Sequence, residues 1–163
     1  ATIMGVEPLY IQRIAQLTNK SNQFNLTTLR CSEDDIRAMA GDKNDLCLCG
    51  KLVDKFGDNG IVTVVAGRQQ GDVLDLTLWL MSCRVLKRGM EDAMMDTVVA
   101  EAAARGVKTI VGHYYPTAKN AMVREFYAQY DFAKTAEDAD GNTEWTLDVA
   151  AYTPKHPHMK IER

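Results

Sequence analysis

The sequence predicts an α+β domain built around one mixed β-sheet with helices packed against it. Three strand-like segments follow one another between residues 45 and 85, then a helix, a strand and a second helix reach residue 130, and a hairpin follows. Consecutive strands favour antiparallel pairing, whereas a helix between two strands favours a parallel crossover. With 163 residues, 46% of them hydrophobic, the chain is long enough for one domain with its own core.

The first 41 residues contain two helix patterns and one alternating segment. Residues 7–22 are expected to form a helix, because Pro8 suits a first helical turn and apolar residues recur at helical spacing up to Leu17. Residues 23–30 alternate like a strand. Ser32 and Asp35 have the spacing of a capping box, so a second helix is expected from there to Gly41.

The rest of the chain alternates between strands and helices. Strands are expected at 45–57, 60–69 and 73–85, with hairpin turns at Asn59-Gly60 and at 69–72. A long helix is expected at 88–106, a buried strand at 107–115, a helix at 117–130 and a hairpin at 131–151. We expect a single domain over residues 1–150 and a loosely held tail over 151–163.

Composition excludes several classes of function. The net charge of −3 and the pI of about 5.6 argue against nucleic-acid binding, and no apolar run is long enough for a membrane span. Four cysteines are too few for a disulfide scaffold of this length. Cys47 and Cys49 should share one strand face, but no set of close Cys/His pairs predicts a metal site. The default expectation is a reduced, cytoplasmic protein.

The motif "SCRVLKRGMEDAMM" at 82–95, with "KN" at 119–120 and "EFYAQYDF" at 125–132, resembles the GNAT-fold acyltransferase superfamily. The resemblance implies a fourth strand that ends in a bulge, followed by a helix whose glycine-rich turn binds the pyrophosphate of coenzyme A. Arg88 and Gly89 match that turn. Asn120 and Tyr127 match an asparagine and a tyrosine that face the coenzyme arm, the tyrosine as general acid.

Four motifs resemble a narrower family more closely: "RIAQLTNKSNQFNLTTLR", "DKFGDNG", "LMSCRVLKRGMED" and "PTAKN" are similar to the C-terminal domain of FkbH-like proteins. This resemblance implies a HAD-type phosphatase domain in the same full-length chain, whose aspartate motif is absent here. It also implies an acyl carrier protein as partner and a glyceryl or acyl unit carried on its phosphopantetheine arm in polyketide-type biosynthesis.

The turn before the long helix departs from the coenzyme A pattern. Leu86 and Glu91 stand where the superfamily has glutamine or arginine and a small residue. A glutamate at a helix N-terminus repels phosphate, which that end of a helix otherwise attracts. A carrier protein delivers pantetheine without the adenosine pyrophosphate, so its binding does not require a glycine at the position of Glu91.

The stretch "NKSNQFNLTT" at 19–28 is rich in amides and poor in charge. If it is extended, Gln23, Asn25 and Thr27 share one face. Neutral donors and acceptors suit a polyamide such as pantetheine, so these residues and Asn22 are expected to line the arm. The alternative is that the amides cap the preceding helix and satisfy local backbone groups.

The remaining candidates lie near the ends of two strands. Cys83 lies at the end of the strand that lines the acyl pocket in the superfamily, and its thiolate suits a nucleophile, although packing is an alternative. His113 is a candidate base. Tyr127 is either an acid or a core aromatic. Arg84 and Arg88 suit a phosphate or an acidic carrier protein, or else solvate a helix start.

These expectations combine into one function with two alternatives. The domain is expected to be a transferase that receives a phosphopantetheine-tethered carrier protein and assists acyl or glyceryl thioester transfer. The first alternative is a stand-alone N-acetyltransferase that uses acetyl-coenzyme A. The second is a non-catalytic module that only docks the carrier protein.

Overall fold

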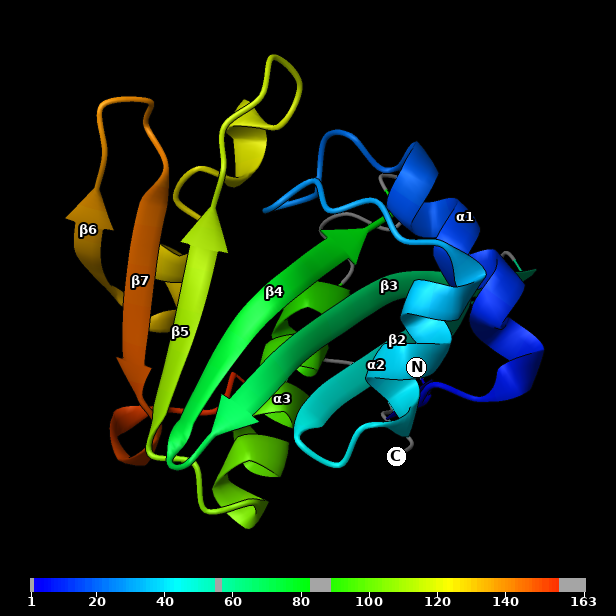
Figure 1. The fold of residues 1–163 in the computed structure, drawn as a ribbon, viewed down its shortest axis with the longest axis horizontal. Helices are drawn as coiled ribbons and strands as arrows, with labels where there is room; N and C mark the ends of the chain where they lie inside the picture. Colours follow the sequence, from blue (N-terminus) through cyan, green and yellow to red (C-terminus); the bar gives the residue numbers. More distant parts are fainter. Residues whose placement is uncertain (1, 55–56, 83–88, 156–163) are drawn as a thin grey trace.

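A computed structural model describes residues 2–54, 57–82 and 89–155, and these contain one seven-stranded mixed sheet (Figure 1). The strand order is β1-β2-β3-β4-β5-β7-β6, and all neighbouring pairs are antiparallel except β4 and β5. The strands are β1 (Thr2–Gly5), β2 (Asp45–Asp54), β3 (Gly57–Gln70), β4 (Val73–Met81), β5 (Thr109–Tyr114), β6 (Ala133–Glu137) and β7 (Thr143–Asp148). The predicted α+β class with a mixed sheet is therefore confirmed.

Helices pack on both faces of the sheet, two on one face and one on the other (Figure 1). On one face, α1 (Ile11–Lys20) and α2 (Glu33–Gly41) pack on β2, β3 and β4. On the other face lies α3 (Met90–Ala104), whose methionines Met90, Met94 and Met95 are fully buried against the sheet. The capping box between Ser32 and Asp35 is present at the start of α2, as predicted.

The two parallel strands separate along their length. β4 pairs with β5 only over Val73–Asp75 and Thr109–Val111, so their carboxyl-terminal halves diverge. The register of β3 against β4 shifts at Thr77, because Ala66 faces Leu78 whereas Gly67 faces Leu76. This bulge lies in the middle of the fourth strand, not at its end as the resemblance implied, and it moves Trp79 and Met81 onto the α3 side.

Two predicted elements are wrong. Residues 23–30 do not form a strand, because their one β-bridge joins Asn25 to Leu80. Residues 117–130 do not form an α-helix but contain the short 3₁₀ segments η3 (Ala121–Val123) and η4 (Tyr127–Tyr130). The buried residues Val123, Phe126, Tyr127 and Tyr130 keep the i, i+3, i+4, i+7 spacing that predicted a helix face. The backbone hydrogen bonds, however, join residues three apart, as from Phe126 N–H to the Val123 carbonyl, so the turns are 3₁₀ and not α.

The predicted hairpin turns have mixed outcomes. The turns at 69–72 and around Gly141 are confirmed, and both glycines there have positive φ. The turn between β2 and β3 does not lie at Asn59-Gly60, because Asp54 already pairs with Gly57. Gly60, with φ of 67°, instead lies where the register between β2 and β3 shifts.

The start of the predicted tail is anchored, contrary to expectation. The Tyr152 hydroxyl and the Lys155 backbone N–H both donate to the Asp96 carboxylate on α3. Two more short 3₁₀ segments are η1 (Pro8–Tyr10), before α1, and η5 (Val149–Ala151), after β7. In the part of the chain that the structure describes, no helix is long and apolar enough to cross a membrane.

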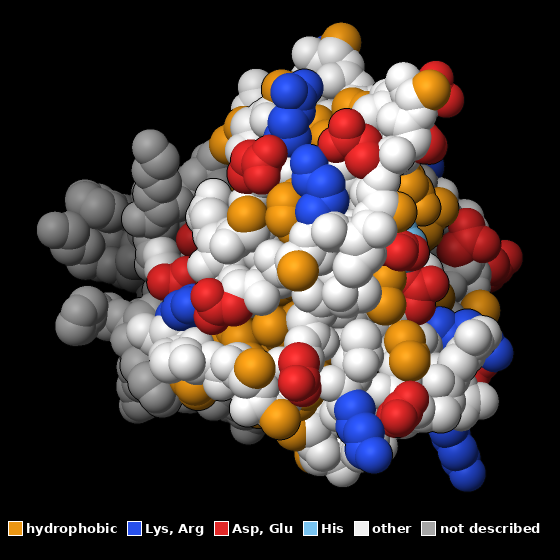
Figure 2. All heavy atoms as spheres, turned by 90° about the vertical axis from the view of Figure 1, so that its left-hand side faces the viewer, with side chains coloured by type: hydrophobic (Ala, Val, Ile, Leu, Met, Phe, Trp, Pro, Cys, Tyr) orange, Lys and Arg blue, Asp and Glu red, His pale blue; other side chains and the backbone are white. Residues whose placement is uncertain are grey.

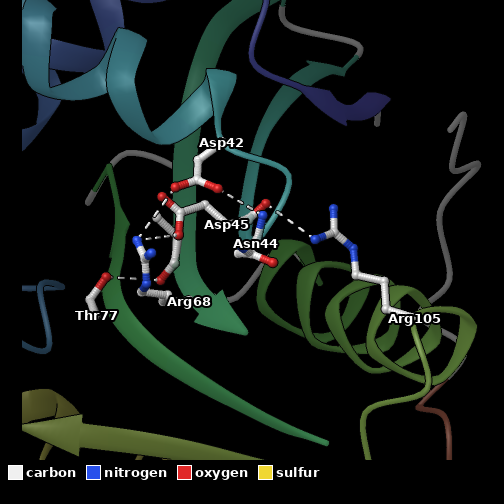
Figure 3. Close-up of polar contacts among 7 residues, drawn as sticks. Asp42, Asn44, Asp45, Arg68, Thr77 and Arg105 are labelled. Atoms are coloured by element: carbon white, nitrogen blue, oxygen red, sulfur yellow. Dashed lines mark hydrogen bonds and ion pairs between the residues drawn. The ribbon is translucent and has the colours of Figure 1, made fainter. Parts of the chain in front are cut away.

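A polar network ties the end of β3 and the end of α3 to the start of β2. Arg68 on β3 lies between Asp42 and Asp45, and Arg105, directly after α3, donates to the Asp45 carbonyl, which ties the end of α3 to the start of β2 (Figure 3). At the β6 edge of the sheet, every residue of the strand is exposed, and the face seen in Figure 2 mixes acidic and basic side chains. Charged edge strands resist pairing with other chains.

Candidate functional site

The split between β4 and β5 is occupied by the chain itself. The segment after α1, light blue in Figure 1, extends between the diverging ends of the two strands. The Leu26 N–H donates to the Trp79 carbonyl at 3.0 Å, and the Met81 N–H donates to the Phe24 carbonyl at 3.0 Å. On the other side, the Tyr115 N–H donates to the Leu26 carbonyl at 2.8 Å. We call Phe24–Thr27 the inner segment.

Asn25 does not present its amide on an open face, which corrects the prediction made for it. Its side chain is fully buried, donates to the Ser21 carbonyl and accepts from the Thr28 N–H. The prediction failed because the segment turns: Thr28 has φ of 53°, and its N–H is held by the Asn25 amide. For Asn25 the structure supports the alternative, in which the amide satisfies local backbone groups.

Asn120 is a fully buried residue that holds this region together. Its amide donates to the carbonyls of Asn25 and Tyr115 at 3.0 Å each, and its oxygen accepts from Thr117 N–H and the Tyr114 hydroxyl. Every polar atom of the side chain therefore has a partner within the protein. In this structure Asn120 therefore serves the backbone of the inner segment, and its contact with a cofactor stays a prediction.

A large cavity lies beside the inner segment on the side of α1. Its volume is about 820 Å³, and its described lining is Arg13, Leu17, Lys20, Ser21, Asn22, Gln23, Ser82 and Lys119. Three of these side chains are cations and none is a carboxylate, while the others are mostly neutral hydrogen-bonding groups. We call this the basic cavity. Asn22 and Gln23, predicted to line a ligand arm, both lie in it.

Arg30 braces the wall of the basic cavity. Its guanidinium donates to the carbonyls of Thr18 and Ser21 at the end of α1 and to the Asn22 side-chain oxygen. These bonds satisfy backbone carbonyls that a helix C-terminus leaves open, and they fix Asn22 beside Lys119. Thr27, the fourth predicted arm residue, instead donates to the Thr77 carbonyl at the bulge of β4.

A second cavity, of about 370 Å³, lies on the α3 side of the inner segment. Aromatic and apolar side chains, among them Phe24, Phe126 and Met122, line it together with Gly89, Glu91 and Asp92 from the start of α3. Gly89 precedes the helix with φ of 84°, and Tyr130 donates to Asp92 at 2.6 Å. We call this the acidic cavity, because two carboxylates, Glu91 and Asp92, line it. Both stand at the N-terminus of α3, and a helix N-terminus without carboxylates attracts anions.

Tyr127 lies in the aromatic core. Its ring packs against Trp79, Phe126 and Phe132, and a Cβ added at Gly112 would come within 2.4 Å of it. Burial is the main cause that raises the pKa of the Tyr127 hydroxyl well above its usual range, with a smaller contribution from Asp75. This packing favours the core role over the acid role.

His113 lies outside both cavities. Its Nε2 is 2.6 Å from Asp75 Oδ1, and its ring lies 5.9 Å from that of Tyr115. The His113–Asp75 pair lies on the same face of the sheet as α1 and α2, beyond the part that these helices cover. Neither residue is in the described lining of the basic cavity or of the acidic cavity. Sequence reasoning missed Asp75, although a carboxylate within the otherwise apolar "VLDLTLWL" was a usable signal.

Three predicted residues, Cys83, Arg84 and Arg88, lie outside the described residues. The other three cysteines are free and buried. Burial raises the pKa of the Cys47 thiol to about 12 and that of Cys49 to about 11, so both are inert packing groups on the predicted shared face. Among the described residues, no group of three His, Cys, Asp or Glu side chains is placed to hold a metal ion.

Sequence reasoning also missed the cations of the basic cavity. Arg13 and Lys20 are two turns apart on α1, a spacing that places them on one helix face. That spacing was visible in the sequence. The approach of Lys119, about a hundred residues later, depends on how the inner segment joins β4 to β5.

Comparisons with known proteins identify the fold class. No protein-family model matches the chain, and no curated protein matches its sequence. Solved structures do match: the GNAT domain of S. lividans PAT has a TM-score of 0.68 at 15% identity, with 90% of this chain and 89% of that chain covered. The chain therefore has the GNAT acetyltransferase fold, as its motifs predicted.

Two further structures share this fold. The ribosomal-protein-S18-alanine N-acetyltransferase from Escherichia coli has a TM-score of 0.67 at 14% identity, and the alignment covers 96% of this chain and 98% of that one. The spermidine N-acetyltransferase from Vibrio cholerae, in complex with CoA and spermine, has a TM-score of 0.66 at 9% identity, with 91% and 95% covered.

Proposed function

We propose that this domain binds the phosphopantetheine arm of an acyl carrier protein and assists transfer of an acyl or glyceryl thioester. The observation that carries the proposal is the basic cavity, with three cations, no carboxylate in its described lining, and neutral amides between them. A phosphopantetheine arm has the matching chemistry, because it joins a phosphate to two neutral amides and a thiol.

The charge of the cavity also suits the partner. Cations at the rim of a binding site attract an acidic surface and orient the encounter, more than they add to the final affinity. Lys20 and Lys119 are exposed at the rim, while Arg13 is half-buried beside Leu17. A carrier protein with an acidic surface around its modified serine would therefore be guided toward this end of the sheet.

The start of α3 supports a ligand without an adenosine pyrophosphate. Glu91 and Asp92 stand in the first turn, where carboxylates stabilise the helix dipole and oppose a phosphate. A carrier-borne arm carries one phosphate and leaves it at the carrier surface. In this proposal Cys83 remains the acyl acceptor, one residue after Ser82 in the wall of the basic cavity.

The alternative is an N-acetyltransferase that uses acetyl-coenzyme A. It is favoured by the fold, since one structure with the same fold is a complex of an N-acetyltransferase with CoA. The carboxylates at the start of α3 weigh against it.

Calorimetric titration separates the two. We expect binding of a phosphopantetheinylated carrier protein, weaker binding of the same carrier without its arm, and no saturable binding of acetyl-coenzyme A. Lys119→Glu should weaken carrier binding about tenfold. Lys108→Glu makes the same change of charge at an exposed position before β5 and should leave binding unchanged. Tight acetyl-coenzyme A binding without carrier binding would replace the proposal with the acetyltransferase.

A further inference from the structure

The backbone groups of β4 that face β5 are a natural docking edge. Where β4 and β5 diverge, the Trp79 carbonyl and the Met81 N–H lack a neighbouring β5 strand. Such an edge binds an extended chain with alternating amide groups, because the chain completes the sheet. In this protein both groups are bonded to the inner segment, through Leu26 and Phe24.

We infer that the inner segment is a fixed, hydrogen-bonded stretch of chain that closes the β4–β5 split, so that an extended thioester arm cannot lie between these strands. The segment bonds to both sides of the split, to Trp79 and Met81 on β4 and to Tyr115 after β5. Thr27 adds a bond of 2.8 Å to the carbonyl of the bulged Thr77. The backbone of the segment thus takes the hydrogen-bonding positions that the amides of an arm would need.

Side-chain packing shows that the segment is built in and does not act as a lid. Leu26 is completely buried, and Phe24 packs edge-on against Phe126 with ring centroids 5.2 Å apart. Asn120 holds the Asn25 carbonyl from the side of η3. Displacing the segment would expose two large apolar side chains and leave buried polar groups without partners, and both effects oppose opening.

The inner segment also separates the two cavities. Gln23 lines the basic cavity beside α1, whereas the next residue, Phe24, lines the acidic cavity beside α3. A ligand in one cavity therefore has no path through the split to the other. The consequence for the arm, which rests on the proposed function, is that phosphopantetheine binds in the basic cavity and leaves the β4 edge untouched.

Hydrogen exchange of the ligand-free protein tests the closure without any ligand. The amides of Leu26 and Met81 should exchange at least about a thousandfold more slowly than in an unfolded chain, in the range of core sheet amides such as Val64. The amide of the exposed Leu29, three residues after Leu26, serves as the comparison from the same stretch. Exchange of Leu26 and Met81 at the rate of an exposed loop would overturn the inference.

Adding 4′-phosphopantetheine or the phosphopantetheinylated carrier protein separates this inference from the proposed function. If the inference holds, NMR shifts change at Asn22 and Lys119 while exchange of Leu26 and Met81 stays slow. Binding that accelerates Leu26 exchange tenfold or more would keep the proposed function and overturn the closure. Slow exchange with no binding of either probe would support the closure and overturn the proposed function.

Discussion

Individual residues show that the same chemical group has different roles at different depths. Asn22 and Asn25 are three residues apart, yet Asn22 is half-exposed in the wall of the basic cavity and Asn25 is completely buried. A buried amide must find internal partners, because an unpaired polar group costs free energy away from water. Asn25 finds them on Ser21 and Thr28, and so it serves the backbone and cannot serve a ligand.

Cys47 makes stability depend on pH in the alkaline range. Burial, followed by the neighbouring Cys49, raises its pKa from 9.0 to about 12. A raised pKa means that the folded state holds the Cys47 proton more tightly than the unfolded state does. The contribution of this thiol to stability is therefore complete below pH 9 and is lost as the pH rises from 9 toward 12. In urea denaturation, Cys47→Ala should remove about 1 kcal/mol of the loss between pH 9 and 10. The exposed substitution Gln23→Ala should keep the full loss, and identical profiles for Cys47→Ala and the wild type would contradict the prediction.

At the scale of elements, local signals decide where helices begin. The capping box of α2 has both bonds, from Asp35 N–H to Ser32 Oγ at 3.1 Å and from Ser32 N–H to Asp35 Oδ2 at 2.9 Å. These bonds are made by residues three apart, so they form whatever the rest of the fold does. The predicted start of α2 was correct for this reason.

Removing the cap should cost stability without touching the site. Ser32→Ala leaves the Asp35 N–H without its partner and should lower the free energy of unfolding by about 1 kcal/mol. Urea denaturation monitored by circular dichroism measures the loss. Ser32→Thr keeps a hydroxyl at the cap and should retain most of the stability. An equal loss in both variants would show that the hydroxyl is not what matters at this position.

Other elements depended on distant contacts. The segment at 117–130 has a helical sequence pattern and buries its aromatic residues in the core, but its backbone forms two separate 3₁₀ turns. The segment at 23–30 alternates like a strand, but it meets β4 at one bridge and then turns at Thr28. In both places tertiary packing overrides local propensity.

At the scale of the whole molecule, Asn120 joins three parts of the chain: the inner segment, the end of β5 and the turn before η3. Asn120→Ala should lower the free energy of unfolding by about 2 to 4 kcal/mol, because several buried groups lose their partner at once. Chemical denaturation measures this. Asn22→Ala removes an amide of the same size from a half-exposed site and should change stability by less than about 0.5 kcal/mol. Similar losses in the two variants would exclude the joining role.

The sequence by itself determined the fold class, the succession of strands from residue 45 onward, the capped helix and the neutral, amide-rich character of the stretch after α1. These features follow from local periodicity and from bonds between near neighbours. Only the tertiary structure decided which amides line the basic cavity, that Tyr127 packs in the core, and that the inner segment fills the β4–β5 split. The reason is that a hydrogen bond from Leu26 to Trp79, or from Asn120 to Asn25, joins residues far apart in the chain, and short-range sequence patterns carry no record of such pairs.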